Sequence, residues 1–515
     1  MSVSRLSLYH PLLLPPLSSH KAILNTPPNS AQTAQIMDTT QAIEALQQAL
    51  PAIQFAKRGS TEYDEFKKIY QSGLCSDIDP AWVVQPTTTE EVSTFVKTIK
   101  PFALNGTARF AIVGGGQQPA PGCSNIENGI TLSLHGLKGI DVKEGRVEVA
   151  AGESWGPVYD KLGEVGLGFS GGRSYRSGIG GLALAGGLSF VSSREGFISD
   201  SVLNYQVVLA SGSVVNANAD ENPDLWVALR GGGNNLGVVT RFDFRTFKQG
   251  PVYGGTLYYF ADSFPKQLEA LVHELQKPEA SNETHFMVSI GYSGMFGSQL
   301  MCLNQVYCTQ GIDKSPVLTP FTDIQPQLDQ MNTLRIHTLA EAAREQAGDR
   351  PGPSRSIYMN TTVKADLGTL QAATDIFSAA IEPLKSSKNI LLSFTLQPYP
   401  LTLLQRSATE GGNVLGLEPE LGSLVSILFL TFWEDREDDD KIITTLRSAL
   451  DEIDRDAGSR GTLVPFKYLD YAAPFQDPIG SYGSANQTKL RDASEKHDPD
   501  GLFQKGVPGG WKLFS

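Results

Sequence analysis

One stretch of the chain, residues 111–122, constrains the fold more than any other. It reads Ala-Ile-Val-Gly-Gly-Gly-Gln-Gln-Pro-Ala-Pro-Gly, so an apolar run at 110–113 ends at three consecutive glycines. Glycine has no Cβ, and the main chain here can therefore lie directly against another group. Successive backbone N–H groups in such a turn form a concave donor site for an anion such as a phosphate. A tight turn after a strand explains a lone triple glycine equally well.

Two further glycine clusters favour the ligand-binding interpretation. Residues 171–187 contain seven glycines, and residues 231–237 read Gly-Gly-Gly-Asn-Asn-Leu-Gly. Segments so poor in side chains indicate close backbone contact with a ligand or with an opposed chain. Neither cluster is a dinucleotide fingerprint, because residues 178–181 lack the spacing and the downstream acidic residue. No Gly-Lys-Ser/Thr follows, which excludes a P-loop.

Composition narrows the class of partner. The 515 residues carry a formal net charge of −13, which disfavours nucleic acid and anionic membrane surfaces. No run of 18 apolar residues exists, so we expect no membrane span. The expected partner is a small-molecule substrate, and the protein is expected to be a monomer or a homodimer.

The first 36 residues read as a leader. They are rich in Ser, Pro and Asn, and their short apolar run is broken by Pro15 and Pro16, which makes a poor signal peptide. We expect a disordered leader before a true start at Met37, and a cytoplasmic protein, with secretion as the alternative. The cysteines show no zinc spacing and are expected to be free thiols, although a bridge between the first two stays open: Cys75, Cys123, Cys302 and Cys308.

The second half of the chain has a different texture. Apolar strand patterns alternate with helical ones, which predicts an antiparallel sheet backed by helices. The expected strands are 255–260, 285–292, 299–308, 390–397 and 425–433, and the expected helices are 266–276, 370–384 and 439–453. On the strand 390–397, Ser393, Thr395 and Gln397 share one face, which looks at a ligand or at water.

Several of these motifs together carry a family resemblance. They are the loop 114–117, Gly-Gly-Arg at 171–173, Gly-Ile-Gly-Gly at 178–181, Asp-Leu-Trp before the third cluster, and a C-terminal piece with Asp-Pro-Asp-Gly-Leu-Phe at 498–503. The chain from about residue 50 resembles the vanillyl-alcohol oxidase and p-cresol methylhydroxylase (PCMH-type) flavoproteins. The most similar branch is the berberine-bridge-enzyme-like group of fungal secondary-metabolite oxidoreductases.

The resemblance implies an α+β fold and FAD as cofactor. The implied divisions are a leader at 1–36, an N-terminal part of the FAD domain at 37–78, a PCMH-type FAD-binding domain at 79–250, a substrate domain at 251–470 and a C-terminal segment at 471–515 that returns to the FAD domain. The implied FAD contacts are Val113, Gly114, Gly115, Gly116, Gln117, Gln118, Gly171, Gly172, Arg173, Ser174, Ser177, Gly178, Gly180, Gly181, Leu184, Gly187, Val238, Tyr482 and Asn486. Simple docking of the C-terminal tail is the alternative for the last two residues.

Two departures from the family pattern concern covalent attachment. Family members often bond the flavin through a His after the first glycine loop and a Cys in the second cluster; this chain has Gln117 and Ser174 there. An amide nitrogen is not nucleophilic, and a hydroxyl is far weaker than a thiolate. We therefore expect FAD held without covalent bonds.

Candidate catalytic residues are few. No His lies in a catalytic motif, and the strand 390–397 carries no Glu. The resemblance places Tyr175 and Arg176 beside the flavin ring, where the first could donate a proton and the second could orient a carboxylate or enolate. Gln397 completes the candidate set, although an amide cannot act as a base. Outward packing of Tyr175 and Arg176 is the structural alternative.

The expected function follows from the resemblance. It is a FAD-linked oxidoreductase that oxidises a small, mostly apolar secondary metabolite by hydride transfer to flavin N5, with O₂ as electron acceptor. The alternative is a FAD-containing cyclase or pericyclase that uses the flavin without redox chemistry. A flavin-free binding protein is a third interpretation, which the three glycine clusters disfavour.

Overall fold

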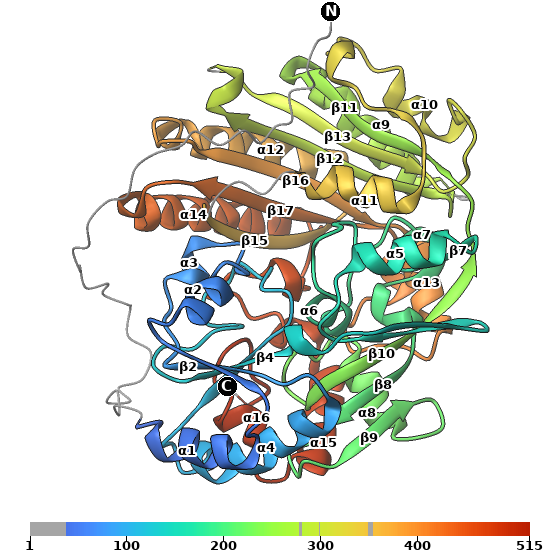
Figure 1. The fold of residues 1–515 in the computed structure, drawn as a ribbon. Coiled ribbons are helices and arrows are strands. Elements are labelled where there is room, and N and C mark those ends of the chain that lie inside the picture. Colours follow the sequence, from blue (N-terminus) through green and yellow to red (C-terminus); the bar gives the residue numbers. More distant parts are fainter. Residues whose placement is uncertain (1–37, 278–280, 298, 349–353, 515) are drawn as a thin grey trace, which may run out of the picture.

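The structure, a computed structural model, describes residues 38–277, 281–297, 299–348 and 354–514 (Figure 1). The expected leader at 1–36 lies outside the described residues. Three sheets organise the molecule, and the two smaller ones belong to the half that carries the glycine clusters. The fold class is confirmed: helices and sheets are mixed, and the largest sheet is antiparallel and backed by helices.

The first sheet delivers the glycine loop. Its order is β1 (Gln54–Lys57), β2 (Trp82–Gln85), β4 (Ile130–Ser133), β3 (Phe110–Val113), with the last three strands parallel. Helix α4 (Thr89–Leu104) makes the crossover from β2 to β3. It starts at a capping box, in which Thr88 accepts from the Glu91 N–H and the Glu91 side chain accepts from the Thr88 N–H. Strand β3 ends at Val113, which places the triple glycine directly after it, at the carboxyl edge of the parallel strands.

The second sheet is antiparallel, in the order β5 (Ile140–Lys143), β6 (Arg146–Ala150), β10 (Val238–Lys248), β8 (Val202–Val208), β9 (Val214–Asn218). The short strand β7 (Leu167–Phe169) also pairs with β10. Helix α5 (Trp155–Gly163) packs against this sheet, and Trp155, Phe169 and Phe244 form an aromatic cluster with ring centroids 5.6–5.8 Å apart. The same core holds α6 (Ile179–Leu184), which lies in the second glycine cluster.

The third sheet has the order β14 (Arg335–His337), β11 (Val252–Phe260), β13 (Met301–Cys308), β12 (Thr284–Ser293), β16 (Leu391–Tyr399), β17 (Leu424–Trp433), β15 (Arg355–Lys364), β18 (Leu463–Val464). Helices α9 (Phe264–Gln276), α12 (Leu367–Ala380) and α14 (Asp439–Ser459) cover one of its faces (Figure 1). The five strands expected in this half are present with slightly different bounds. The sequence analysis missed β15, whose Asn-Thr-Thr run interrupts the apolar pattern although these residues are buried.

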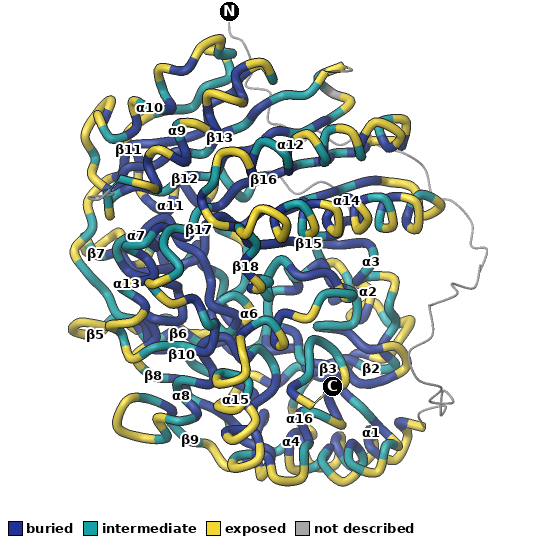
Figure 2. The backbone as a smooth tube through the Cα atoms, turned by 180° about the vertical axis from the view of Figure 1, so that it is seen from behind, coloured by how far each residue is buried: buried dark blue, intermediate teal, exposed yellow. Residues whose placement is uncertain are grey.

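Alternation along these strands separates a core face from a site face. Leu392, Phe394 and Leu396 of β16 pack under the helices, whereas Thr395 and Gln397 face the other way, towards the glycine clusters. Strand β17 repeats the pattern, since Ile427 and Phe429 enter the core whereas Leu428, Leu430 and Phe432 line the cavity on the other face. Figure 2 shows that the strands of this sheet are mostly buried and that the outward turns of α12 and α14 are exposed. The sheet thus turns one face, which carries both polar and apolar side chains, towards the other half of the molecule.

The C-terminal segment returns to the first half of the chain. It contains helices α15 (Ser484–His497) and α16 (Leu502–Lys505), and the Phe110 N–H donates to the carbonyl of Gly506 at 2.9 Å. The Asn235 side chain donates to the Trp511 carbonyl at 2.9 Å. The remaining helices are α1 (Thr40–Ala49), α2 (Thr61–Lys67), α3 (Gly73–Ser76), α7 (Ser192–Glu195), α8 (Pro223–Leu229), α10 (Thr319–Thr322), α11 (Leu339–Ala347) and α13 (Leu401–Thr409).

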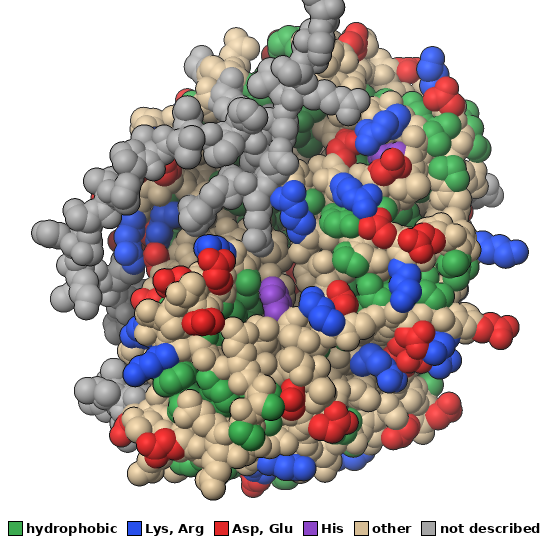
Figure 3. All heavy atoms as spheres, viewed as in Figure 1, with side chains coloured by type: hydrophobic (Ala, Val, Ile, Leu, Met, Phe, Trp, Pro, Cys, Tyr) green, Lys and Arg blue, Asp and Glu red, His purple; other side chains and the backbone are tan. Residues whose placement is uncertain are grey.

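The surface carries charges of both signs. On the face shown in Figure 3, basic and acidic side chains are interspersed over the described residues. None of the described helices is both long and apolar enough to cross a membrane. Within the described chain, all four cysteines are free thiols, so the Cys75–Cys123 bridge that the sequence left open does not form.

Candidate functional site

The glycine loop forms the floor of a large cavity. The cavity has a volume of about 990 Å³, at the upper end of the usual range for small-molecule sites. Gly115 lies so close to Gly178 that a Cβ on it would stand 2.5 Å from the Gly178 nitrogen, which ties the first cluster to the second. A Cβ on Gly114 or on Gly181 would meet nothing within 4 Å, because these two residues border the open cavity. The missing side chain therefore allows close packing of the loop at Gly115, and it lets a ligand in the cavity reach the backbone at Gly114 and Gly181.

The third cluster and the C-terminal segment complete the lower wall. Gly233, Asn234 and Asn235 line the cavity, and so do Gly510 and Trp511. The sequence analysis did not name these five residues as site residues. Their proximity follows from the returning C-terminus, which no local pattern encodes.

A polar network from both halves forms the upper wall. The Arg173 guanidinium leaves the second glycine cluster and donates to the Gln397 amide oxygen at 2.9 Å and to the Tyr471 hydroxyl at 2.8 Å. Tyr471 in turn donates to the same Gln397 oxygen at 3.1 Å. The Gln397 Nε2 is buried and has no partner among the described residues. A donor at the cavity wall is therefore free for a ligand acceptor.

Two further side chains contact the same guanidinium. Arg173 donates to the Met287 sulfur at 2.8 Å and lies 3.3 Å from His285 Nε2. Burial, and secondarily the Arg173 charge, hold the pKa of His285 well below its usual value. The imidazole is therefore neutral and accepts from Arg173.

Asp470 is the acid of this cavity. Among the described residues it is the only acidic side chain in the lining, and its Oδ2 is buried without a partner. Burial raises the pKa of Asp470 to about 7, although the Tyr468 hydroxyl partly offsets the effect. A carboxyl that changes charge near neutral pH is typical of proton-transfer sites.

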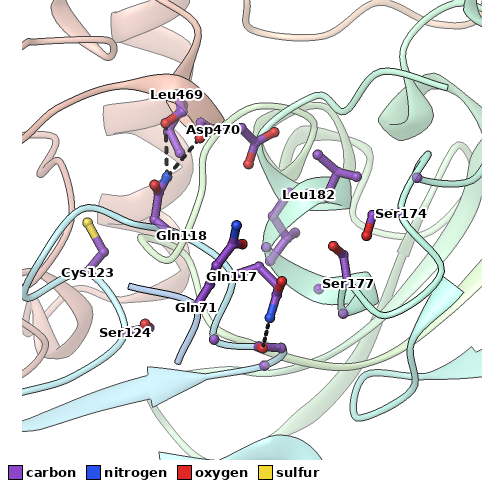
Figure 4. Close-up of a pocket in the computed structure, with 18 of the residues that line it drawn as sticks. Gln71, Gln117, Gln118, Cys123, Ser124, Ser174, Ser177, Leu182, Leu469 and Asp470 are labelled. Atoms are coloured by element: carbon purple, nitrogen blue, oxygen red, sulfur yellow. Dashed lines mark hydrogen bonds between the residues drawn. The ribbon is translucent and has the colours of Figure 1, made fainter. Parts of the chain in front are cut away.

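The glycine loop fixes the main chain of Asp470. The Gln118 side chain donates to the carbonyls of Leu469 and Asp470 at 3.2 and 3.3 Å (Figure 4). Gln117 instead folds back and donates to the Gly115 carbonyl at 3.1 Å. The loop that forms the cavity floor thus also holds the segment that carries the acid.

Most of the residues expected at a cofactor lie together at this cavity. The lining contains Gly114, Gly115, Gly116, Gln117, Gln118, Gly172, Arg173, Ser174, Ser177, Gly178, Gly180, Gly181, Leu184 and Val238. Val113 is fully buried directly below the loop, and neither Gly171 nor Gly187 lines the cavity. Tyr482 and Asn486 lie outside the lining: the Tyr482 hydroxyl donates to the Gly231 carbonyl at 3.2 Å, and Asn486 donates to the Tyr482 carbonyl at 3.1 Å.

The three candidate catalytic residues lie in three different environments. Gln397 is at the centre of the polar network. Arg176 lines the cavity but is exposed. Tyr175 is not in the lining; its hydroxyl contacts Asp160, and Arg344 donates to it at 3.0 Å. The structure thus brings one of the three into contact with the buried network.

Sequence reasoning missed Asp470 and Tyr471. The available signal was the sequence Tyr-Leu-Asp-Tyr at 468–471, which places three titratable side chains within four residues. Nothing in that pattern shows that it enters a cavity.

Comparisons with known proteins agree with this geometry. The family described as "FAD binding domain" matches residues 80–218. FAD-dependent monooxygenase FUP4 from Fusarium proliferatum (strain ET1) is 34% identical over 462 residues, which are 87% of this chain and 88% of that protein. FAD-dependent monooxygenase tpcD from Cochliobolus heterostrophus (strain C5 / ATCC 48332 / race O) is 34% identical over 445 residues, 84% of this chain and 85% of that one.

Solved structures show the same fold. A xylooligosaccharide oxidase from Myceliophthora thermophila C1 superposes with a TM-score of 0.73 at 22% identity, covering 92% of this chain and 99% of that one. The 6-hydroxy-D-nicotine oxidase from Arthrobacter nicotinovorans gives 0.71 at 17% identity, covering 88% and 96%.

The fold and the glycine-lined cavity define a flavoprotein oxidoreductase. The chain belongs to the FAD-binding family that includes the fungal FAD-dependent monooxygenases, and it shares its fold with the solved oxidases. The family resemblance, the enzyme class and FAD as cofactor are thereby confirmed.

The described residues fit FAD. Open space at Gly114 and Gly181 lets a ligand touch the main chain, and the cavity is large enough for a dinucleotide next to a substrate. Backbone N–H groups of such a loop suit a pyrophosphate. Cys123 also lines the cavity, but burial raises the pKa of its thiol to about 12, so the reactive thiolate is suppressed.

Proposed function

We propose that this protein holds FAD without covalent bonds and oxidises a small, mostly apolar metabolite, with O₂ as electron acceptor. The observation that carries the proposal is one cavity with a glycine floor and a roof of Arg173, Gln397 and Tyr471. The glycine loop 114–118 and the second glycine cluster would hold FAD there, and the cofactor would supply a two-electron acceptor at flavin N5 that O₂ reoxidises. The chain divides accordingly into an FAD-binding part at 79–250, with 37–78 and the returning 471–515, and a substrate part at 251–470.

The side chains of the roof handle the substrate. The unpartnered Gln397 Nε2 donates to a substrate oxygen. Met287, Leu428 and Leu430 supply apolar contacts from the sheet. The substrate loses a hydride from carbon and a proton from the adjacent hydroxyl or carbon, and the Asp470 carboxylate accepts that proton.

Non-covalent binding is proposed from the residues at the two attachment positions. The Gln117 amide is hydrogen-bonded to its own loop, and Ser174 has only a hydroxyl. Acid precipitation of the purified protein should therefore release yellow flavin into the supernatant. Colour that stays in the pellet would show a covalent bond and contradict this part of the proposal.

Redox use of the flavin is tested by anaerobic mixing with substrate. Bleaching of the flavin absorbance is the expected result. Product formed with unbleached flavin would instead establish the cyclase or pericyclase alternative. The buried acid at Asp470 supports the oxidoreductase, because it provides the proton acceptor that the sequence did not reveal.

The fate of O₂ is a separate question. Relatives carry the name FAD-dependent monooxygenase, which supports O₂ as a second substrate. Under ¹⁸O₂, an oxidase yields labelled hydrogen peroxide and an unlabelled product. A monooxygenase transfers one labelled oxygen atom into the product, and that outcome would replace the oxidase reaction proposed here.

A further inference from the structure

We infer that the cavity selects a substrate with an anionic oxygen, a carboxylate or an enolate, and that Arg173 is the residue that recognises it. This inference rests on the proposed function, since it concerns the substrate side of the same cavity. It assigns to Arg173 a role beyond the cofactor contact that the family resemblance implies.

The first observation is an uncompensated buried cation. Arg173 is 9% exposed, and none of the described carboxylates lies within 4 Å of its guanidinium. Among the described residues, its four hydrogen-bond partners are an amide oxygen, a phenol, a thioether and a neutral imidazole. A guanidinium keeps its charge in proteins, and burial of a charge without a counter-charge is costly. The arrangement is completed electrostatically by an anion.

Other basic residues of the lining do not share this property. Lys67 is paired with Asp79 at 2.6 Å, and Lys68 is paired with Glu65. Arg176 is exposed, so that water solvates its charge. Arg173 therefore is the lining cation whose charge is neither paired with a described carboxylate nor open to solvent.

The second observation is that two of the four acceptors are weak. A thioether is a poor acceptor, and the contact with His285 is long at 3.3 Å. A ligand oxygen that replaces the Met287 contact on the cavity surface gains a charge-assisted hydrogen bond. The Gln397 and Tyr471 contacts stay in place and hold the guanidinium plane.

The lining also offers almost no acidic side chain that could neutralise Arg173 in place of a ligand. Asp470 is the only acidic side chain of the lining within the described chain, and it forms no ion pair with Arg173. Burial keeps it protonated below about pH 7, the value to which its pKa is raised. An anionic ligand consequently meets a positive site at and below neutral pH.

The experiment compares a carboxylate with its neutral isostere. Benzoate and benzamide are titrated into FAD-loaded protein below pH 7, and binding is followed by calorimetry and by the flavin absorbance. Benzoate should bind about tenfold or more tightly than benzamide, the ratio expected for one charge-assisted hydrogen bond. Arg173→Met should abolish the ratio, and Arg173→Lys should retain part of it, since the charge remains but the planar fork is lost.

Arg176→Met is the matched control, because it removes an exposed guanidinium from the same loop. It should keep the benzoate preference. Loss of the preference in Arg176→Met but not in Arg173→Met would overturn the inference. So would equal binding of the two probes by the wild type, or no binding of benzoate at millimolar concentration.

Two readouts separate this inference from the proposed function. Flavin content is measured in every variant: a colourless wild type contradicts the proposed function itself. A yellow wild type without benzoate preference contradicts only the role of Arg173. If Arg173→Met shifts the flavin midpoint potential while the benzoate preference persists, the guanidinium serves the cofactor, and the inference is overturned.

Discussion

At the scale of single residues, burial sets the chemistry of this cavity. Asp470 and Gln397 each present one buried polar atom without a partner among the described residues. Such atoms are costly in a folded protein, and these two lie at the cavity, where a bound ligand would supply their missing partners. Asp470 differs from a surface carboxylate chiefly in its desolvation, which raises its pKa to about 7.

Asp470→Asn tests its role as proton acceptor. The wild-type kcat/KM should rise with pH through about 7, because the carboxyl must be ionised to accept a proton. The variant should lose this limb and fall in rate by about 10²–10⁴-fold. Steady-state kinetics from pH 5 to 9 measure both effects, with the exposed Asp492→Asn as control. An unchanged pH limb in Asp470→Asn would assign the proton transfer to another group.

The same substitution has a signature in stability. The folded pKa is raised from 3.8 to about 7, so the unfolded state releases its proton first as pH rises. The wild type should therefore lose up to about 4 kcal/mol relative to Asp470→Asn between pH 4 and pH 7, with no further change above. Urea denaturation at each pH provides the comparison. A difference independent of pH would mean that Asp470 is not desolvated.

At the scale of elements, the glycine loop after β3 has two roles, packing against the second glycine cluster and leaving space for a ligand. Gly115 packs against the backbone of Gly178, where no side chain fits. Gly114 borders open space, where a side chain fits sterically but occupies the cavity. Adjacent glycines in one loop are therefore needed for folding and for binding, respectively.

Alanine substitutions distinguish the two roles. Gly114→Ala should fold normally and bind FAD more weakly by about 1–3 kcal/mol, the usual cost of an inserted methyl group. Gly115→Ala should lower thermal stability, because backbone atoms must move. Fluorescence titration of the apoprotein and thermal melts measure the two effects. Gly163→Ala, at an exposed helix position with open space, is the control, and equal FAD affinity in Gly114→Ala would contradict the cradle.

At the scale of the whole molecule, Arg355 joins the two halves through its contact with Asp77. Arg355, on β15 of the large sheet, forms a bidentate pair with Asp439 and also contacts Asp77 at 2.9 Å, after α3. Beside it, the Ser72 hydroxyl donates to the Ser356 carbonyl at 2.8 Å. Ser76 and Ser354, the chain neighbours of Asp77 and Arg355, line the cavity, so this junction lies directly beside it.

Arg355→Met should destabilise the protein by about 3–5 kcal/mol, because Asp439 would stay buried without its counter-charge. Arg460→Met breaks an exposed pair with Asp456 and should cost less than about 1 kcal/mol. Chemical denaturation of both variants provides the measurement. Equal small losses would show that the Arg355 pair does not secure the junction.

The sequence by itself determined the local features of this protein. The glycine clusters predict close backbone contact, because the absence of side chains can be read directly from the sequence. The shared face of Thr395 and Gln397 follows from the two-residue period of a strand. The positions of Gln117 and Ser174 likewise predicted a flavin without covalent bonds, which stays a prediction. All of these depend on neighbours within a few residues.

Only the tertiary structure decided which polar groups meet. Arg173 contacts Gln397 across 224 residues and Tyr471 across 298, and no periodicity encodes such distances along the chain. In the sequence, Asp470 looks like any other aspartate. Its pKa is raised because segments distant in the chain exclude water from it. Tyr175 lies outside the lining for the same kind of reason: it contacts Asp160, 15 residues away, and Arg344, 169 residues away.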